Sequence, residues 1–379
     1  MSPAAFLRDY WQKRPLLVRQ AFPDFQSPIS PEDLAGLACE EAALSRIVMH
    51  DRARDRWELR TGPFDEAMFP DLPRQDWTLL VQDVDKWDMD IRALLGAFRF
   101  LPAWRLDDLM VSFAAPGGSV GAHVDQYDVF LLQAQGHRRW QIDSRTGAPL
   151  DFRDDVELKL LSVFEPDHDW VLAPGDMLYL PPGVPHHGVA EDACLTFSVG
   201  MRAPSRAELM VDLAEELAAA LPEESRYADP DLAPARDAWE IDDAAFGRLR
   251  TALSDLQSLD EDRLRAWFGR FITQYRAGGE IDAPARVPDA DTLARGLDQG
   301  GILLRHPHSR VAWARHGRGA RLFANGLGLS LGIADARRLA AAERLDAAGL
   351  AALGTRGREA LQTLVAAGHY QLVKPRRKR

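Results

Sequence analysis

Short apolar runs separated by proline, glycine and aspartate fill the N-terminal half of this chain, and they limit its fold more than any other feature. Runs of four to seven residues with such breaks are typical of strands. Many in succession predict a β-barrel or β-sandwich over residues 1–203, with helical patterns near 4–12, 31–44 and 88–97. The clearest runs are L-L-V-R at 16, W-T-L-L-V at 77, L-M-V-S-F at 109, Y-D-V-F-L-L-Q at 127, R-R-W-Q-I at 138, D-W-V-L at 169, M-L-Y-L at 177 and C-L-T-F-S-V at 194.

Helical periodicity replaces this pattern after residue 203. Ser205 is a typical N-cap, and apolar residues follow it at helical spacing. Two further helical patterns, F-G-R-L-R-T-A-L-S-D-L-Q-S-L and D-R-L-R-A-W-F-G-R-F-I-T, come after a loop rich in proline and aspartate. We therefore expect a helical region over residues 204–278, which packs either on a partner or on the barrel.

The remaining residues, 279–379, mix helices with short strands. They follow the linker-like A-G-G-E-I-D-A-P-A-R-V-P and include strand-like I-L-L-R, V-A-W-A-R and R-L-F-A-N. Helical patterns lie near 290–298, 333–341 and 356–367. The mixture resembles a winged-helix module. The closing K-P-R-R-K-R is a charge run of a kind that is usually only solvated.

Composition sets the class of protein. Apolar residues make up 46% of the chain, enough for sizeable cores. A formal net charge of −11 argues against a general nucleic-acid coat, although not against a local basic patch. The only cysteines are Cys39 and Cys194, so a disulfide framework is excluded and a reducing compartment is favoured. With no secretory signal pattern and no membrane-length apolar run, we expect a cytoplasmic protein.

The stretch G-A-H-V-D-Q-Y-D-V-F, residues 121–130, holds two metal-ligand residue types two apart in a strand-like run. On a strand, His123 and Asp125 would project from one face into the barrel. A buried carboxylate is costly unless it is paired or bound to metal. One more histidine would complete the two-histidine, one-carboxylate triad of Fe(II) oxygenases, which leaves positions open for a bidentate co-substrate and O₂.

The third ligand is expected in G-D-M-L-Y-L-P-P-G-V-P-H-H-G, residues 175–188, which resembles the second cupin motif. His186 stands at the motif's histidine position, and His187 is the rival ligand. Strand alternation would turn His187 to the opposite face, so His186 is the predicted ligand. The first cupin motif is half present, with Asp125 in place of its second histidine. That change, from H-x-H to H-x-D, is typical of an iron and 2-oxoglutarate site.

A 2-oxoglutarate site also needs a cation for the distal carboxylate, and a planar guanidinium binds a carboxylate in a bidentate manner. The candidates lie in G-H-R-R-W. Arg138 and Trp140 would share one face of a strand and Arg139 would take the other. The pattern alone leaves open which face is inward.

Together these motifs resemble the JmjC family of iron- and 2-oxoglutarate-dependent oxygenases. In that family a basic residue thirteen positions after the aspartate binds 2-oxoglutarate, so the resemblance selects Arg138 for this role. The bacterial ribosomal oxygenase branch is the most similar. Its motifs are matched over about residues 10–200 by Y-W-Q-K-R-P-L-L-V-R-Q-A-F, D-D-L-M-V-S-F, H-V-D-Q-Y-D-V-F, R-R-W and P-P-G-V-P-H. The resemblance implies an α+β, multidomain fold: a double-stranded β-helix (jelly-roll, cupin) JmjC barrel over 1–203, a helical dimerisation region over 204–278 and a winged-helix-like domain over 279–379.

The resemblance also implies a substrate pocket. Asp108, Met110 and Ser112 share one face of the strand D-D-L-M-V-S-F. Asp108 would pair with a substrate guanidinium, Met110 would pack on its aliphatic stem, and Ser112 would help to hold 2-oxoglutarate. Tyr127 would hydrogen-bond to the guanidinium or stack on it, and Ser198 would hydrogen-bond to the substrate.

Plainer interpretations stay open for this pocket. Met110 is equally well explained as a core residue, and the two serines as groups that only satisfy the backbone. Asp107 replaces Asp108 if the strand register is shifted by one residue.

In function, the resemblance implies a protein hydroxylase with Fe(II) on His123, Asp125 and His186, and with 2-oxoglutarate and O₂ as co-substrates. Its substrate would be an arginine of large-subunit ribosomal protein sixteen, hydroxylated at the β-carbon. A homodimer made through the helical region is implied, with no membrane and no direct nucleic-acid binding required.

Two alternatives stay open, one in the same enzyme class and one in another class of protein. One is a 2-oxoglutarate oxygenase that acts on a histidyl or small-molecule substrate, and an acid at position 108 disfavours it because an acid suits a cation. The other is a cupin ligand-sensing regulator joined to a DNA-binding winged helix, which the net charge of −11 disfavours.

Overall fold

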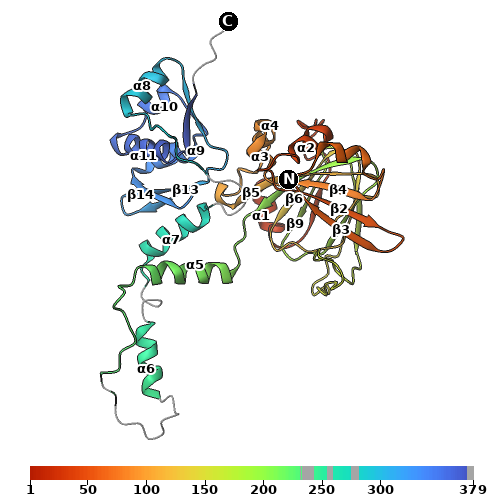
Figure 1. The fold of residues 1–379 in the computed structure, drawn as a ribbon, viewed down its shortest axis with the longest axis horizontal. Helices are drawn as coiled ribbons and strands as arrows, with labels where there is room; N and C mark the ends of the chain where they lie inside the picture. The colour runs from red at the N-terminus through yellow and green to blue at the C-terminus, as the bar shows by residue number, and fades with distance from the viewer. Residues whose placement is uncertain (231, 233–242, 254–258, 275–280, 374–379) are drawn as a thin grey trace. The chain divides into compact units, whose positions relative to one another are not determined.

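The computed structural model of this chain describes residues 1–230, 232, 243–253, 259–274 and 281–373. Contacts between residues divide it into two compact units, one formed by Met1–Ala203 and one that begins at Pro204 (Figure 1). No helix in these described ranges combines the length and the apolar character needed to cross a membrane. The basic tail, 374–379, and the start of the linker-like stretch lie outside the described residues.

The first unit is built from two antiparallel sheets. The larger has the strand order β1-β9-β6-β11-β5-β4-β2-β3, and the smaller has the order β10-β7-β8. Side chains of both sheets meet in one apolar cluster, so the sheets face each other as in a jelly roll, and the expected barrel is confirmed. The strands are β1 (Leu16–Val18), β2 (Ser45–Asp51), β3 (Arg56–Thr61), β4 (Trp77–Val81), β5 (Leu106–Ala114), β6 (Val129–Gln135), β7 (Arg138–Ile142), β8 (His168–Leu172), β9 (Met177–Leu180), β10 (His186–Ala190) and β11 (Cys194–Met201).

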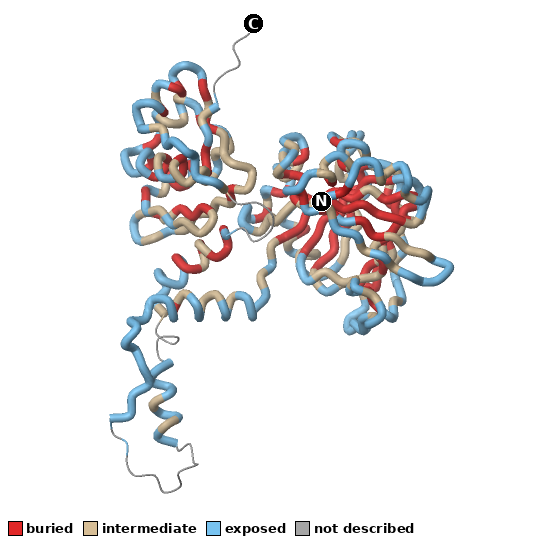
Figure 2. The backbone as a smooth tube through the Cα atoms, in the orientation of Figure 1, coloured by how far each residue is buried: buried red, intermediate tan, exposed pale blue. Residues whose placement is uncertain are grey.

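The middle of the larger sheet is covered on both faces, whereas its edge strand β3 is largely exposed. Phe130 of β6 belongs to the core shared with the helices, whereas Leu131 packs toward the smaller sheet with Trp140. Buried backbone fills the middle of the barrel (Figure 2), and β4 and β11 are buried along their whole length. Their sequences are accordingly apolar except for Thr78, Thr196 and Ser198. The helices of this unit are α1 (Pro3–Asp9), α2 (Pro31–Leu37), α3 (Val84–Trp87) and α4 (Met89–Leu94).

One sequence expectation about the barrel is wrong. H-V-D-Q-Y was expected to continue as a strand into V-F-L-L, but β6 begins only at Val129. Residues 123–127 lie outside regular strands, and His123 forms only an isolated bridge with His186. The alternation rule therefore does not apply to this segment, and its side chains are directed by loop conformation.

The second unit begins with a helix whose start the sequence predicted. Helix α5 (Arg206–Ala219) follows Ser205, and the Ser205 hydroxyl accepts a hydrogen bond from the Glu208 N–H while the Glu208 carboxylate accepts one from the Ser205 N–H. This reciprocal cap fixes the boundary at the residue that the sequence indicated.

Helix α7 (Glu261–Thr273) joins the helical stretch to the C-terminal module. The indole Nε1 of Trp267 donates to Asp212 of α5 at 2.8 Å. On the other side, Gly269 lies against the ring of Phe323 in β14, a closeness that no larger residue would permit. The helical stretch and the C-terminal module thus share one compact unit. Of the pattern at 246–259, the structure describes α6 (Asp243–Ala252).

The C-terminal module combines two three-stranded sheets, β16-β12-β17 and β13-β14-β15, with short helices around one apolar core. Its elements are α8 (Ala290–Asp298), β12 (Ile302–Arg305), β13 (Val311–His316), β14 (Gly319–Ala324), β15 (Leu327–Leu331), α9 (Ile333–Ala341), β16 (Arg344–Leu345), α10 (Ala347–Ala351), α11 (Thr355–Ala366) and β17 (Tyr370–Val373).

Candidate active site

Three metal-ligand side chains converge at one end of the barrel. Oδ2 of Asp125 lies 3.7 Å from Nε2 of His186 and 3.9 Å from Nε2 of His123. One potential ligand atom from each residue falls within 4.8 Å of the others. The spacing brings two imidazoles and one carboxylate around a common point.

Hydrogen bonds hold both imidazoles in the form that a metal requires. Nδ1 of His123 lies 3.0 Å from the carbonyl of Gly121, and Nδ1 of His186 lies 2.9 Å from that of Val184. Each Nδ1–H donates to its carbonyl, which leaves both Nε2 lone pairs directed at Asp125. Burial, followed by the charge of His123, holds the pKa of His186 well below its usual range, so this ring is neutral. Two imidazoles and a carboxylate fit a divalent metal such as Fe(II).

The neighbouring histidine takes no part in this arrangement. His187 is the next residue on β10 and turns to the other face, where its ring meets Phe164 edge-on with the centroids 6.1 Å apart. His187 does not line the cavity, whereas His186 does.

The three ligands border a cavity of about 300 Å³ inside the barrel. Strand pairing explains why residues from distant parts of the sequence share its wall: Ser112 of β5 lies opposite Thr196 of β11, and Met110 opposite Ser198. The cavity brings together all the residues that the sequence singled out, namely Asp108, Met110, Ser112, His123, Asp125, Tyr127, Arg138, His186 and Ser198.

The two adjacent arginines of β7 have opposite environments. Arg139 points outward and pairs with Asp169 and Glu191 at 2.8 and 2.6 Å. Arg138 is buried, and its guanidinium carbon lies 5.0 Å from the ring centroid of Trp140. The sequence pattern left the inward face undecided, and the fold assigns Arg138 and Trp140 to it.

Three polar atoms of the cavity wall lack partners. Thr78 Oγ1, Arg138 Nε and Trp140 Nε1 are buried and make no hydrogen bond to any described residue. An unpaired buried polar group costs about 1–3 kcal/mol. Burial also lowers the pKa of the Arg138 guanidinium. A ligand with carboxylate oxygens would compensate these groups, so the cavity fits 2-oxoglutarate. Thr78 escaped the sequence analysis, where its only signal is a hydroxyl within the buried run W-T-L-L-V.

Gly188 is a second residue that the sequence analysis missed. A Cβ at this position would lie 2.7 Å from two ring atoms of Trp140 and 2.8 Å from Arg138 Nε. The Gly188 carbonyl also accepts a hydrogen bond from Arg138 Nη2 at 3.3 Å. The absence of a side chain therefore lets Arg138 and Trp140 approach β10.

Asp108 supplies the acid of the cavity. Burial, together with the negative charges of Asp83, Asp107 and Asp85, raises the pKa of Asp108 to about 7. Asp107, the alternative that the sequence left open, lies outside the cavity wall, with Oδ1 3.9 Å from Nη1 of Arg202. Burial and the neighbouring carboxylates also raise the pKa of Tyr127.

A buried aspartate anchors the loop that carries the first two ligands. Asp128 accepts hydrogen bonds from the Tyr179 hydroxyl at 2.6 Å, from Gln12 Nε2 at 2.8 Å and from Arg105 Nη2 at 3.0 Å. The donors come from three separate segments, so sequence spacing gave no sign of this role. The anchor fixes the end of the loop three residues after Asp125.

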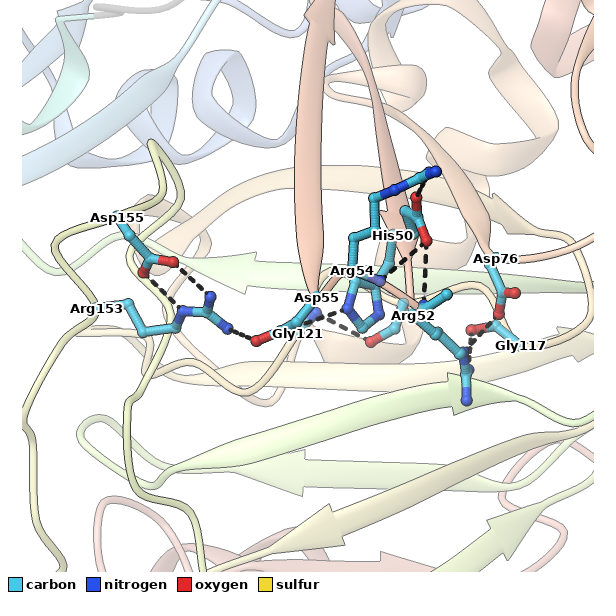
Figure 3. Close-up of polar contacts among 12 residues, drawn as sticks. His50, Arg52, Arg54, Asp55, Asp76, Gly117, Gly121, Arg153 and Asp155 are labelled. Carbon is cyan, nitrogen blue, oxygen red and sulfur yellow. Dashed lines mark hydrogen bonds and ion pairs between the residues drawn. The ribbon is translucent and has the colours of Figure 1, made fainter.

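A network of charged residues ties the β2–β3 hairpin to two loops (Figure 3). Arg52 donates to Asp76 and to the Gly117 carbonyl, both at 2.7 Å. Arg153 donates to Asp55 at 2.7 Å. Gly117 opens the segment that leads to the ligands, and the loop after Arg153 lines part of the cavity. The network therefore holds two borders of the site to one hairpin.

Comparison with known proteins identifies both parts of the chain. Residues 93–209 match the family model of the JmjC domain, and residues 252–371 match that of the ROXA-like winged helix. The chain is 39% identical over 309 residues to ribosomal protein uL16 3-hydroxylase of Escherichia coli, a match that covers 81% of this chain and 80% of that protein.

Solved structures agree over nearly the whole length. The X-ray structure of E. coli YcfD matches with a TM-score of 0.86 and 34% identity and covers 98% of both chains. The structure of the ribosomal oxygenase YcfD with cobalt and 2-oxoglutarate matches with a TM-score of 0.83 and 35% identity, again over 98% of both chains. The resemblance found in the sequence is thus confirmed, and this chain belongs to the JmjC-type ribosomal oxygenases, enzymes that depend on a metal and 2-oxoglutarate.

Proposed function

We propose that this enzyme hydroxylates the β-carbon of an arginine in the large-subunit ribosomal protein uL16. The observation that carries the proposal is the acid of Asp108 in the wall of the same cavity as the ligand triad, because an acid there suits a guanidinium. The similarity to a uL16 3-hydroxylase supports the same substrate. A neutral or anionic small molecule would leave this acid unpaired.

In this proposal His123, Asp125 and His186 hold Fe(II). With 2-oxoglutarate and O₂, the bound iron supplies the oxidant that places a hydroxyl group on a C–H bond. The chain's own contribution is rigid positioning, since Gly121 and Val184 carbonyls fix the two rings and Asp128 fixes the loop.

Arg138 and Ser112 bind 2-oxoglutarate in this proposal. Arg138 is buried beneath the cavity, so its pairing with a carboxylate is shielded from water and is stronger for that reason. The Ser112 hydroxyl makes only a long contact of 3.5 Å to the Thr196 carbonyl, so it is available to a ligand oxygen.

The substrate arginine is held by the remaining residues of the cavity. Asp108 pairs with its guanidinium, Met110 packs on its aliphatic stem, and Tyr127 and Ser198 hydrogen-bond to it. Binding the guanidinium away from the ligand triad leaves the β-carbon nearest to the metal, which is the positioning that selects one C–H bond.

The proposal is tested by incubating the purified enzyme with Fe(II), 2-oxoglutarate and uL16 from the same cells, followed by mass spectrometry of uL16 peptides. We expect a gain of one oxygen on a single arginine, lost in His123→Ala. His187→Ala is the matched control, because His187 lies beside a ligand but faces away, and it should retain activity. Turnover of 2-oxoglutarate without modification of uL16 would refute uL16 as the substrate, while the assignment to the 2-oxoglutarate oxygenases would remain.

A second copy of this chain is the proposed partner of the helical stretch. Met210 of α5 is 72% exposed and Leu264 of α7 is 39% exposed. A hollow of about 450 Å³ between these helices is lined by Leu209, Met210, Leu213, Leu264, Arg265, Trp267 and Phe268. Exposed apolar surface of this kind marks association, and we propose a homodimer. We place the enzyme in the cytoplasm, where ribosomal proteins are synthesised.

A further inference from the structure

One stretch of this acidic protein contains no acid at all. Residues 299–334 include five arginines and three histidines but neither aspartate nor glutamate, in a chain whose net charge is −11. They form β12 and the sheet β13-β14-β15 of the C-terminal module. The positive charge is therefore concentrated on β12, on the sheet β13-β14-β15 and on the segments that join them.

Three arginines of the C-terminal module lie on β13, in the turn after it or on α9, and one of them contacts an indole ring. The guanidinium carbon of Arg337, on α9, lies 5.4 Å from the ring centroid of Trp313 on β13. Arg315 is two residues further along β13, so it shares the face of Trp313. Arg318 lies in the turn between β13 and β14, after Gly317 with its positive φ of 54°. All three arginines are exposed. We call Arg315, Arg318 and Arg337 the basic cluster.

The basic cluster is uncompensated, unlike the arginines of the barrel. Arg139, Arg145 and Arg153 each pair with two acids. Among the described residues, no acid lies within ion-pair distance of any member of the basic cluster. Exposed arginines without acidic partners favour an anionic ligand, whose charge would pair with theirs.

We propose that the basic cluster with Trp313 is an RNA-binding surface that contacts the phosphate backbone. Arginines interleaved with an aromatic ring are the arrangement that proteins use for nucleic acids, where guanidiniums bind phosphates and rings stack on bases. Trp313 packs partly against the core but is only half-buried, so part of its indole is available to a base, which an acidic protein lacks. The choice of RNA over DNA rests on the proposed function, since the proposed substrate is a protein of the large ribosomal subunit, a particle built of RNA and protein.

Binding is measured by fluorescence anisotropy of the full-length enzyme with a fluorescein-labelled single-stranded RNA of twelve nucleotides, at several KCl concentrations. We expect the triple variant Arg315→Ser/Arg318→Ser/Arg337→Ser to bind at least about tenfold more weakly. The slope of log K against log salt should fall by about two, because each phosphate contact to a single strand contributes about 0.7. Arg315→Ser/Arg318→Ser keeps the Arg337–Trp313 contact and should show an intermediate loss, which guards against misfolding of the triple variant.

Two controls locate the surface. Arg356→Ser changes an exposed arginine of α11 in the same module and should leave RNA binding unchanged. A chain ending at Val373, which lacks the basic tail, should keep the dependence on the basic cluster. If only the tail or Arg356 matters, the proposal is wrong.

Four further outcomes are informative. If poly-L-glutamate displaces the labelled RNA as well as unlabelled RNA does, the ligand of this surface is an acidic protein and not RNA. If a DNA duplex binds more tightly than the RNA, the ligand is DNA. Hydroxylation of free uL16 by the triple variant should equal that of the unaltered enzyme, because none of its residues lines the cavity. RNA binding by an enzyme that does not hydroxylate uL16 would support the RNA-binding surface and refute only the proposed function.

Discussion

At the scale of single residues, Asp108 lies where it can pair with a substrate guanidinium, but its surroundings disfavour the ionised form of its carboxyl group. Its pKa of about 7 means that the carboxyl is half protonated near neutral pH in the enzyme without substrate. A guanidinium pairs only with the ionised form. We therefore expect kcat/KM for an arginine substrate to fall about tenfold between pH 8 and pH 6, since the ionised fraction falls by about that factor. A pH profile of initial rates measures this.

The variant Asp108→Asn tests how the same carboxyl group affects activity and stability. The folded state raises this pKa above the ordinary Asp value of 3.8, so ionisation removes stability progressively as pH rises from about 4 to about 7. At pH 8 Asp108→Asn should be less active but more thermostable than the unaltered protein. Asp107→Asn is the matched control, outside the cavity. A pH profile that Asp108→Asn leaves unchanged would assign the titration to another group.

We predict that the buried hydroxyl of Thr78 binds 2-oxoglutarate. Its Oγ1 lines the cavity and has no hydrogen-bond partner among the described residues. We expect Thr78→Val to weaken 2-oxoglutarate binding about tenfold or more, because a hydrogen bond to a charged group contributes about 1.5–3 kcal/mol. Calorimetry with the manganese-loaded enzyme measures this without turnover.

The contact that Thr78 makes can be located by changing the ligand. Binding of 2-oxopentanoate, which lacks the distal carboxylate, should be equal in Thr78→Val and the unaltered enzyme. Thr78→Ser should restore 2-oxoglutarate affinity. A loss of equal size for both ligands would show that the hydroxyl only supports the fold.

At the scale of elements, β10 is shaped around its neighbour β7. Gly188→Ala would place a methyl group 2.7 Å from the Trp140 ring, so Trp140 and Arg138 would have to shift. Overpacking of this kind costs about 1–3 kcal/mol. We expect a lower melting temperature and weaker 2-oxoglutarate binding, read by calorimetry. Gly36→Ala in helix α2, where nothing lies within 4 Å, should show neither effect.

Alternation along a strand was a reliable guide only where a strand exists. It placed Asp108, Met110 and Ser112 together on β5, and the cavity wall contains all three. It was also applied to the segment from His123 to Tyr127, which is a loop. That segment reaches the cavity because its ends are fixed by the bridge to β10 and by Asp128, contacts that no local pattern encodes.

At the scale of the whole molecule, the exposed apolar surface of α5 and α7 carries the prediction of a dimer. Met210→Glu and Leu264→Glu should each shift the mass measured by light scattering toward that of a monomer, because a buried unpaired carboxylate costs several kcal/mol. Leu150→Glu, at a 45% exposed leucine of the barrel, should leave the mass unchanged. An unaltered enzyme that is monomeric at micromolar concentration would contradict the prediction.

The sequence by itself determined the barrel, the start of α5 and the chemistry of the site. Apolar period, capping residues and ligand spacing are local properties, and motif resemblance extended them to the JmjC-type ribosomal oxygenases. The tertiary structure decided which of two adjacent residues faces the cavity: Arg138 and not Arg139, Asp108 and not Asp107. It alone revealed Thr78, Gly188 and Asp128, because unpaired hydroxyls, close approaches and long-range anchors exist only when distant strands have been brought into register.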